Sequence, residues 1–496
     1  DAIATGNFYP GWLAESNHGY GDPSFRFYPP ALYYLLALFR FITGEWYVAT
    51  LLTFALVSVA GGLGVFFWAR SVLPSSQAMW ASILYSVAPY HVNQVYQATM
   101  LAEWAGAAVL PFVFAFLERV CTHGKRRDVA GLAGCYALLV LTHLPLTVIG
   151  SIALLVYALM RLDAGRRLQT LLKLAAAAGL GLCASAIYWV TMISELRWIG
   201  VNSIYYDSSV DYRYNFLLST FSPDNLNVWW MNILAFMTLL LGAPVILFLR
   251  RHARHDRPPL KSVVVLTAFA VFMAVPLSRP VWQLLSPLQE TQFPWRWLVL
   301  VSLGVALLAG AAIPLLDHAD KMFARAKRLG IVGAMSIAVV FTFSHSVREA
   351  KFLTPSAFNH ELDAVRGTVS VSSWFPVWAS SSPTRMSQAV EAADRSVVVN
   401  TWAPERRQFS IGAGTRAEAR LKTFYYPHWA ATSGNQVFPT RPDKDGALLV
   451  SLPADALTVE VVFNEPRRSR LAAVASFAGF MFIGVLTLPF RLRRKH

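Results

Sequence analysis

The chain has 496 residues, of which 55% are hydrophobic and only 14% are charged, whereas about 25% of residues are charged in an average soluble protein. The apolar residues form long blocks separated by short charged clusters, which is the pattern expected when lipid is the solvent. A net charge of +15 would suggest a nucleic acid partner for a soluble protein. No nucleic-acid-binding motif is present, however, and membrane proteins collect Lys and Arg in their cytoplasmic loops. The composition therefore indicates an integral membrane protein whose first partner is the lipid bilayer.

The predicted elements begin with an outer segment, residues 1–45. Within it, residues 29–42 are apolar and aromatic but too short to span a membrane easily. If they did cross the membrane, every later cluster of Lys and Arg would move to the outer side of the membrane. We therefore predict a helix that lies in the outer membrane interface, where Tyr33 and Tyr34 are favourably placed.

Eleven membrane-spanning helices are predicted within residues 46–345 and at the C-terminus. A spanning helix needs ~20 apolar residues to cross ~30 Å of hydrocarbon. The stretch Val129–Met160 is too long for one span, and Pro145 near its middle interrupts helix hydrogen bonding. We therefore expect two short helices that meet at His143. The predicted spans are Trp46–Trp68, Met79–Tyr90, Trp104–Leu117, the two halves of Val129–Met160, Leu171–Met192, Trp229–Leu249, Ser262–Leu277, Leu298–Leu315, Ile331–Phe343 and Leu471–Phe490.

The basic clusters set the expected orientation of these spans. An even number of spans separates each cluster from the next, so all of them fall on one side, which the positive-inside rule assigns to the cytoplasm. The clusters are Arg119–Arg127, Arg161–Lys173, Arg250–Lys261, Lys321–Arg328 and Arg491–Lys495. The segments 91–103, 195–228, 278–296 and 346–469 are then expected outside the cytoplasm.

The segment 346–469 differs in kind from the rest. Alternating apolar and polar residues indicate strands at Ser396–Thr401, Ala447–Leu452 and Leu457–Phe463, separated by turns rich in Pro, Asp and Gly. We predict an extracytoplasmic β-sandwich-like domain over 346–469, followed by the last span and a basic tail in 470–496. The predicted fold class is an α-helical polytopic membrane protein with a C-terminal β-rich domain.

Glu103 is the sharpest candidate for chemistry, because it lies at the outer end of the third predicted span. A carboxylate at the membrane boundary can bind a divalent cation or orient an acceptor. An acidic residue at a helix N-terminus is also stabilised by the helix dipole alone, and residue chemistry by itself favours that account. His91 and His143 lie at the same outer boundary. Either can contact a ligand, although interfacial anchoring or packing explains them as well.

The outer segment 195–228 combines aromatic rings and carboxylates, which suit sugar hydroxyls, with arginines, which suit phosphate. Outer loops beside a membrane are rich in aromatic residues in any case. Arg296, which opens the ninth predicted span, can bind a lipid phosphate bidentately or extend its charge to headgroups, and the two accounts are equally supported. The candidates in the outer segment are Tyr205, Tyr206, Asp207 and Arg213.

Other chemistry finds no support in the sequence. There is no Walker loop, dinucleotide fingerprint, CxxC or HExxH motif, so ATP hydrolysis and redox catalysis are unsupported. Three cysteines, an odd number, suggest neither a disulfide framework nor a zinc site.

Several segments together resemble a bacterial membrane protein family that is named after a 6-pyruvoyl-tetrahydropterin-synthase-related domain. Nothing in the sequence indicates the soluble pterin enzyme itself. The resemblance extends over nearly the whole chain, and the family is similar to a branch of the C-type glycosyltransferases. The segments that carry it are Gly6–Trp12, Gly19–Phe25, Phe27–Tyr34, Gln292–Trp297, Trp374–Trp378 and Phe424–Trp429.

The resemblance implies transfer of a sugar from a polyprenyl-phosphate donor to an acceptor on the outer face of the bacterial inner membrane. In those enzymes a carboxylate activates the acceptor, alone or with a divalent metal such as Mg or Mn, and arginines hold the leaving phosphate. Glu103 falls where their second acidic residue lies, and Pro29–Tyr34 resembles their juxtamembrane Pro-Pro-x-Tyr-Tyr segment, which adds Tyr28 and Tyr33 as substrate contacts. Their first acidic motif is expected shortly before residue 1, so the chain is expected to be an N-terminally shortened or a degenerate relative.

The leading hypothesis is therefore a membrane glycosyltransferase that acts on a glycan, lipid or protein acceptor. Its expected site is an outward-facing cavity with Glu103 near the floor and walls from Tyr20–Tyr34, Tyr205–Arg213 and Arg296. The alternative is a non-catalytic protein of cell-envelope polymer assembly or export, whose β-domain binds the polymer. A secondary transporter is less well supported, since it should show inverted repeats and ionisable groups at mid-membrane.

Overall fold

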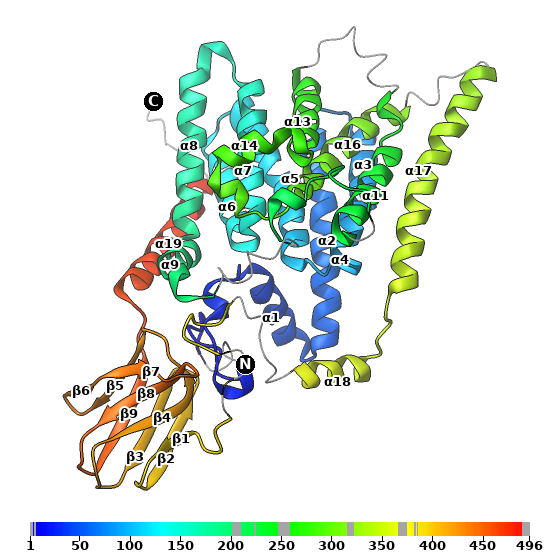
Figure 1. Ribbon diagram of the computed structural model, residues 1–496. Coiled ribbons are helices and arrows are strands. Elements are labelled where there is room, and N and C mark those ends of the chain that lie inside the picture. The colour runs from blue at the N-terminus through cyan, green and yellow to red at the C-terminus, as the bar shows by residue number, and fades with distance from the viewer. Residues whose placement is uncertain are drawn as a thin grey trace, which may run out of the picture. The chain divides into compact units, whose positions relative to one another are not determined.

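The computed structural model describes residues 3, 6–200, 210–222, 225–246, 258–314, 322–365, 374–380, 383 and 385–488. The chain divides into two compact units (Figure 1). The first, called the β unit below, comprises Asp1–Pro30, Ala186–Tyr206 and Leu353–Ala475. The second, called the helical unit, comprises Ala31–Ser185, Asp207–Phe352 and Ser476–His496.

The helical unit is a bundle whose centre is α16. Every residue of α16 is buried, and the helix packs on α3 and α13. Gly310 of α16 faces the backbone of α3, where a Cβ would lie 2.7 Å from the Ala81 nitrogen. The helices are α1 (Ala31–Thr43), α2 (Trp46–Arg70), α3 (Ser75–Ser86), α4 (Pro89–Tyr96), α5 (Leu101–Thr122), α6 (Arg126–Thr142), α7 (Leu144–Arg161), α8 (Arg167–Ala184), α11 (Leu226–Leu241), α13 (Pro258–Ala274), α14 (Arg279–Leu284), α15 (Ser286–Gln289), α16 (Leu298–Ala312) and α17 (Met322–Glu349). A last helix, α19 (Arg467–Thr487), begins in the β unit and continues in the helical unit.

Within the described residues, six helices are long and apolar enough to cross a membrane, and counting two sharply bent pairs as spans brings the number to eight. The polytopic helical character predicted from the sequence is thus confirmed, whereas eleven spans are not. The six are α2, α5, α7, α17, α19 and the continuous stretch Pro294–Ala312, and the bent pairs are Ala164–Ala184 with Ala186–Trp198 (71°) and Pro259–Ala274 with Pro276–Leu284 (87°).

Helix breaks shorten several of the predicted spans within the described residues. The second predicted span ends early, because the residue before Pro89 is disfavoured in a helix, and the chain forms two short helices there. With 12 residues, α3 is roughly 18 Å long at 1.5 Å per residue, well short of a bilayer core. The expected break at His143 is confirmed, since α6 ends at Thr142 and α7 begins at Leu144.

The β unit contains two antiparallel sheets, with strand orders β1-β4-β8-β7 and β2-β3-β9-β5-β6 (Figure 1). Alternate residues of β3, β4 and β9 are buried, which is the period expected of strands that pack one face on a core. This confirms the predicted C-terminal β-sheet domain. The strands are β1 (Val390–Ala392), β2 (Val397–Ala403), β3 (Arg406–Ile411), β4 (Ala417–Phe424), β5 (Trp429–Ser433), β6 (Gln436–Phe438), β7 (Thr440–Pro442), β8 (Ala447–Leu452) and β9 (Leu457–Phe463).

The N-terminal segment packs into the core of this β unit. The Trp12 ring lies 5.6 Å from that of Trp429, and the Tyr20 ring stacks on Phe424 at 5.0 Å. Gly21 allows the Trp12 ring to approach the backbone closely, since a Cβ at Gly21 would lie 2.1 Å from the Trp12 indole nitrogen. Its φ of +72° also favours glycine at this position. Two further helices belong to the unit, α9 (Ala186–Glu195) and α18 (Pro355–Val365).

Candidate functional site

Glu103 lies in the first turn of α5 and is 1% exposed. Its carboxylate accepts hydrogen bonds from the Tyr90 hydroxyl at 2.5 Å and from the Gln94 amide at 2.9 Å. The Arg296 Nε donates to its second oxygen at 2.8 Å. Since a buried charge is costly unless it is paired and hydrogen-bonded, these three donors explain why the sequence can place a carboxylate here.

The short helix α4 aims two of these donors at Glu103. Tyr90 and Gln94 stand four residues apart and therefore share one face of the helix. Pro89 starts the helix, a position where proline needs no hydrogen-bond partner. The connection to α5 is tight, with the Met100 amide donating to the Gln94 carbonyl at 2.9 Å.

Arg296 comes from a 3-10 turn, Pro294–Trp297, that leads directly into α16. Its guanidinium lies over the Phe293 ring at 4.8 Å, and Nη1 donates to the Thr291 carbonyl. Arg has five N–H donors, and the described hydrogen bonds of Arg296 use one on Nε and one on Nη1. The side chain is thus fixed from two sides and retains donors for a further acceptor.

The two predicted histidines pack beside this pair. The His91 Nε2 accepts a hydrogen bond from the Trp104 indole at 3.1 Å. The His143 Nδ1 accepts from the Leu146 amide at 3.2 Å and so caps α7. A Cβ on Gly106, one turn beyond Glu103, would lie 3.1 Å from the His143 Cβ. Both rings therefore help to hold the N-terminal end of α5 in place.

A row of hydrogen bonds, which the sequence did not reveal, extends from Glu103 to α11. The Trp230 indole donates to the Asn93 side-chain oxygen at 2.7 Å, and the Asn93 amide donates to the Gln94 oxygen at 3.2 Å. A narrow crevice with no room for a water molecule lies at the far end of this row. It is lined by Asn93, Gln97, Trp230, Leu234, Phe341, Thr342, His345 and Ser346. The only sequence signal for it is the Trp229-Trp230 pair.

Three of the remaining predicted residues, Tyr33, Arg213 and Tyr28, lie among the described residues. Tyr33 is 46% exposed on α1. Arg213 is an exposed side chain that pairs with Asp211 at 2.5 Å. Tyr28 belongs to the β unit, where its ring meets that of Trp374 edge-on at 6.4 Å. Tyr205, Tyr206 and Asp207 lie outside the described residues.

The surroundings of Glu103 do not fit a divalent metal ion. Mg²⁺ needs several oxygen ligands, but the partners of Glu103 are a hydroxyl, an amide NH₂ and a guanidinium that all donate hydrogen bonds to it. Within the part of the chain that the structure describes, no group of three or more His, Cys, Asp or Glu side chains could hold a metal. These residues therefore do not suit the Mg or Mn ion expected from the resemblance.

A second buried charge cluster, whose members the sequence patterns did not bring together, lies in the β unit. Arg26, which is fully buried, donates two hydrogen bonds of 2.7 Å to Glu195 and also pairs with Glu465. Tyr426 and His428 each contact the same Glu195 carboxylate at 2.9 Å. The cluster thus joins segments up to 439 residues apart in sequence.

Electrostatics in this second cluster favour charged side chains. The Glu195 side chain is fully buried, and it is paired with the Arg26 guanidinium and with the His428 ring. Burial, together with the negative charge of Glu195, raises the pKa of Tyr426. Glu195 is therefore an ionised anchor that Arg26 neutralises.

Among solved structures, the chain resembles the arabinofuranosyltransferase AftD from Mycobacteria at 17% identity and a TM-score of 0.45, over 72% of this chain and 25% of that one. It also resembles ArnT from Cupriavidus metallidurans, bound to undecaprenyl phosphate, at 16% identity and a TM-score of 0.40, over 73% of this chain and 70% of that one. The chain thus spans about a quarter of the length of AftD. TM-scores below 0.5 are too low to assign a shared fold or function. No curated protein matches the chain.

Family membership is decided by a different comparison. Residues 25–349 match the family model of the 6-pyruvoyl-tetrahydropterin synthase related domain, which is described as a membrane protein. The match takes in about two-thirds of the chain, including both Glu103 and Arg296. The protein therefore belongs to the 6-pyruvoyl-tetrahydropterin synthase-related family of membrane proteins.

Proposed function

We propose that this protein is a membrane glycosyltransferase that transfers a sugar from a polyprenyl-phosphate donor to an extracytoplasmic glycan, lipid or protein acceptor at the bacterial inner membrane. The observation that carries the proposal is the buried Glu103–Arg296 pair at 2.8 Å. Each partner stands where a long apolar helix begins. An arginine held there can bind the phosphate of a lipid whose chain runs along the apolar helices. The segments that resemble the C-type glycosyltransferases support the same function.

The proposed reaction is a direct displacement at the anomeric carbon of the sugar. The acceptor oxygen forms a bond to that carbon, and the bond to the phosphate oxygen breaks. The lipid phosphate leaves with the electron pair, and the acceptor proton passes to a base. Arg296 stabilises the negative charge that develops on the departing phosphate, a role in which a fixed donor in a dry site is most effective.

For Glu103 we propose a positioning role toward Arg296. A carboxylate that already accepts three hydrogen bonds and is 1% exposed is a poor base until some of those donors leave. Its charge also keeps the guanidinium in place while the phosphate approaches. The general-base role of Glu103 predicted from the sequence remains a prediction. A measurement of lipid affinity distinguishes the two roles, because only a positioning residue should affect how tightly the lipid binds.

The test uses full-length purified protein, with undecaprenyl phosphate as the binding probe and undecaprenyl-phosphate sugars for transfer. Arg296→Lys should weaken lipid binding about tenfold or more, a loss of about 1.4 kcal/mol, because lysine lacks the planar fork. Glu103→Gln should weaken lipid binding as well if Glu103 positions Arg296, but should slow only transfer if it is the base. Arg406→Lys, which alters an exposed pair on the β unit, is the matched control.

Two outcomes oppose the proposal. Unchanged lipid affinity in Arg296→Lys, in a protein that melts like the wild type, removes Arg296 from the donor site. Lipid binding without transfer, across donors carrying glucose, mannose and arabinose, favours the non-catalytic alternative.

A further inference from the structure

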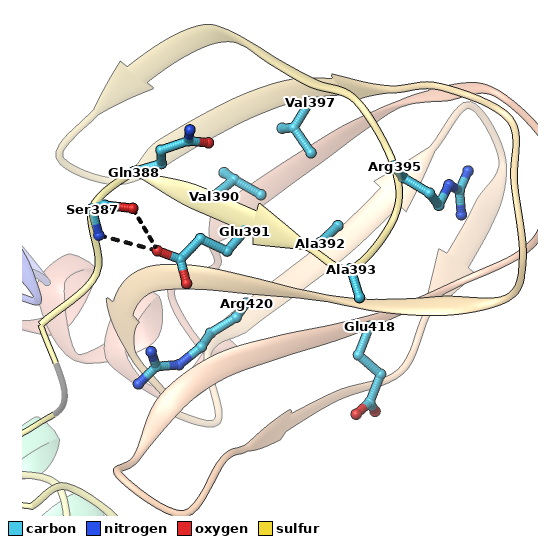
Figure 2. A pocket seen from close by; sticks show the side chains of 10 residues that line it. All are labelled: Ser387, Gln388, Val390, Glu391, Ala392, Ala393, Arg395, Val397, Glu418 and Arg420. Atoms are coloured by element: carbon cyan, nitrogen blue, oxygen red, sulfur yellow. Dashed lines mark hydrogen bonds between the residues drawn. The ribbon is translucent and has the colours of Figure 1, made fainter.

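A cavity of about 500 Å³ opens on the β unit, and none of the candidate site residues predicted from the sequence is among the residues that line it. It is flanked by β1 and β2, which are the edge strands of the two sheets and follow each other along the chain. Residues of β4 complete it (Figure 2). Ligand sites commonly have volumes of about 300–1,000 Å³, so the cavity has room for a small organic ligand.

The lining of this cavity is polar and electrically balanced. It contains two arginines and two glutamates, and a serine and a glutamine add uncharged donors and acceptors. Four short aliphatic side chains form the rest of the wall. The lining residues are Ser387, Gln388, Val390, Glu391, Ala392, Ala393, Arg395, Val397, Glu418 and Arg420.

This balance points away from charged ligands. A phosphate or nucleic acid site carries an excess of Arg and Lys, and a cation site carries an excess of carboxylates. Sugar hydroxyls both donate and accept hydrogen bonds, and the C–H faces of a sugar ring are apolar. A lining of paired donors, acceptors and small aliphatic groups suits a neutral saccharide.

The charged groups of the cavity are already held in place. Arg420 donates to Asp443 at 2.6 Å and to Asp445 at 3.2 Å. One oxygen of Glu391 accepts two hydrogen bonds from Ser387, at 3.1 and 3.3 Å (Figure 2). Its other oxygen has no hydrogen-bond partner among the described residues. Side chains fixed in advance lose little freedom when a ligand binds.

Arg395 is fixed in the same manner. Its guanidinium donates to the carbonyl oxygens of Gly412, Pro453 and Asp455 at 2.6–2.7 Å. These contacts tie the turn between β1 and β2 to two other loops, so the wall of the cavity is rigid on that side. The exposed Gln388 side chain supplies an adjustable amide at the rim.

We propose that this cavity is a saccharide-binding groove that takes a neutral oligosaccharide, and that this oligosaccharide is the acceptor. The second part rests on the proposed function. The first part stands without it, because it depends only on the shape and lining of the groove. Glycan acceptors are then favoured over lipid and protein acceptors.

The experiment is calorimetric titration of the full-length protein in detergent with cellotetraose, mannotetraose and arabinotetraose, and with tetragalacturonate as the charged comparison. We expect one neutral tetrasaccharide to bind. Glu391→Gln and Gln388→Ala should each weaken that binding about fivefold or more. Glu460→Gln, on β9 and outside the lining residues, is the matched control and should bind like the wild type, with equal melting temperatures for all variants.

Three results would overturn the proposal that the cavity binds a neutral saccharide. They are no binding of any neutral tetrasaccharide, preferred binding of tetragalacturonate, and unchanged affinity in both groove variants. Other results bear on the acceptor role and leave saccharide binding by the groove intact. A chain that binds the saccharide but never transfers sugar keeps the groove and removes the acceptor role. A chain that transfers sugar at the same rate with Glu391→Gln removes the groove as the acceptor site.

Discussion

Two buried arginines, Arg296 in the helical unit and Arg26 in the β unit, make similar ion pairs in different surroundings. Arg26 meets two carboxylates, and its Nε, Nη1 and Nη2 atoms are all engaged by them. Among the described residues, Arg296 meets one carboxylate, which is itself shared with Tyr90 and Gln94.

The difference shows why a buried ion pair alone is weak evidence for function. Arg26 has every nitrogen on a glutamate and joins distant parts of the chain, so its contacts are those of a structural tie. Arg296 keeps unused N–H donors and stands at the start of an apolar helix. Among the described residues, the hydrogen bonds of Arg26 use four of its five N–H donors, whereas those of Arg296 use two. The number of unused donors, more than burial or pairing, is what distinguishes the proposed phosphate ligand from the structural tie.

The largest effect is expected when the tie is broken. Arg26→Met leaves Glu195 and Glu465 without their partner, and losing one side of a buried pair costs about 3–5 kcal/mol. The free energy of unfolding, or the melting temperature of the purified chain, measures the loss. Arg406→Met removes an exposed pair and should cost less than about 1 kcal/mol. Equal melting temperatures of Arg26→Met and Arg406→Met would show that Arg26 does not hold the β unit together.

Removing one hydroxyl from each cluster sharpens the comparison. Tyr90→Phe and Tyr426→Phe each take one donor from a buried carboxylate, which commonly costs about 1–3 kcal/mol of stability. Only Tyr90→Phe should also weaken undecaprenyl phosphate binding, because in the proposed function Glu103 orients Arg296, the arginine proposed to bind the lipid phosphate. A weaker lipid affinity in Tyr426→Phe would mean that the two clusters cannot be separated in this way.

The smallest effect is expected at Arg213. Its side chain is 66% exposed, and its contacts are with the neighbouring Asp211. Arg213→Ala should therefore change stability by less than about 1 kcal/mol. Lipid affinity measured on the same sample tests its predicted role in substrate binding. A large drop in melting temperature would show that Arg213 is a structural tie like Arg26.

Local patterns in the sequence predicted local structure well. The strands at Ala447–Leu452 and Leu457–Phe463 have the predicted bounds, because alternation and turns are local signals. The break at His143 was equally visible from Pro145. Eleven spans are not confirmed among the described residues, because hydropathy does not show where a helix bends, as at Ser185 between α8 and α9.

Pairings between distant residues were beyond the reach of these patterns. Glu103 and Arg296 were each predicted as candidates, but their ion pair joins positions 193 residues apart. The partners of Arg26 lie 169 and 439 residues away, and no periodicity links them. The packing of Trp12 against Trp429 was likewise invisible, because it depends on how the N-terminal segment folds back onto the sheets.

Sugar transfer by reconstituted full-length protein tests the central claim most directly. Liposomes with undecaprenyl-phosphate glucose, mannose or arabinose and a mixture of oligosaccharide acceptors would be assayed at equal protein levels. The account predicts transfer from one of these donors, a fall of about 10²-fold or more in Arg296→Lys and Glu103→Gln, and normal transfer in Arg406→Lys. Wild-type protein that transfers none of the three sugars, or near-normal transfer by both Arg296→Lys and Glu103→Gln, would contradict it.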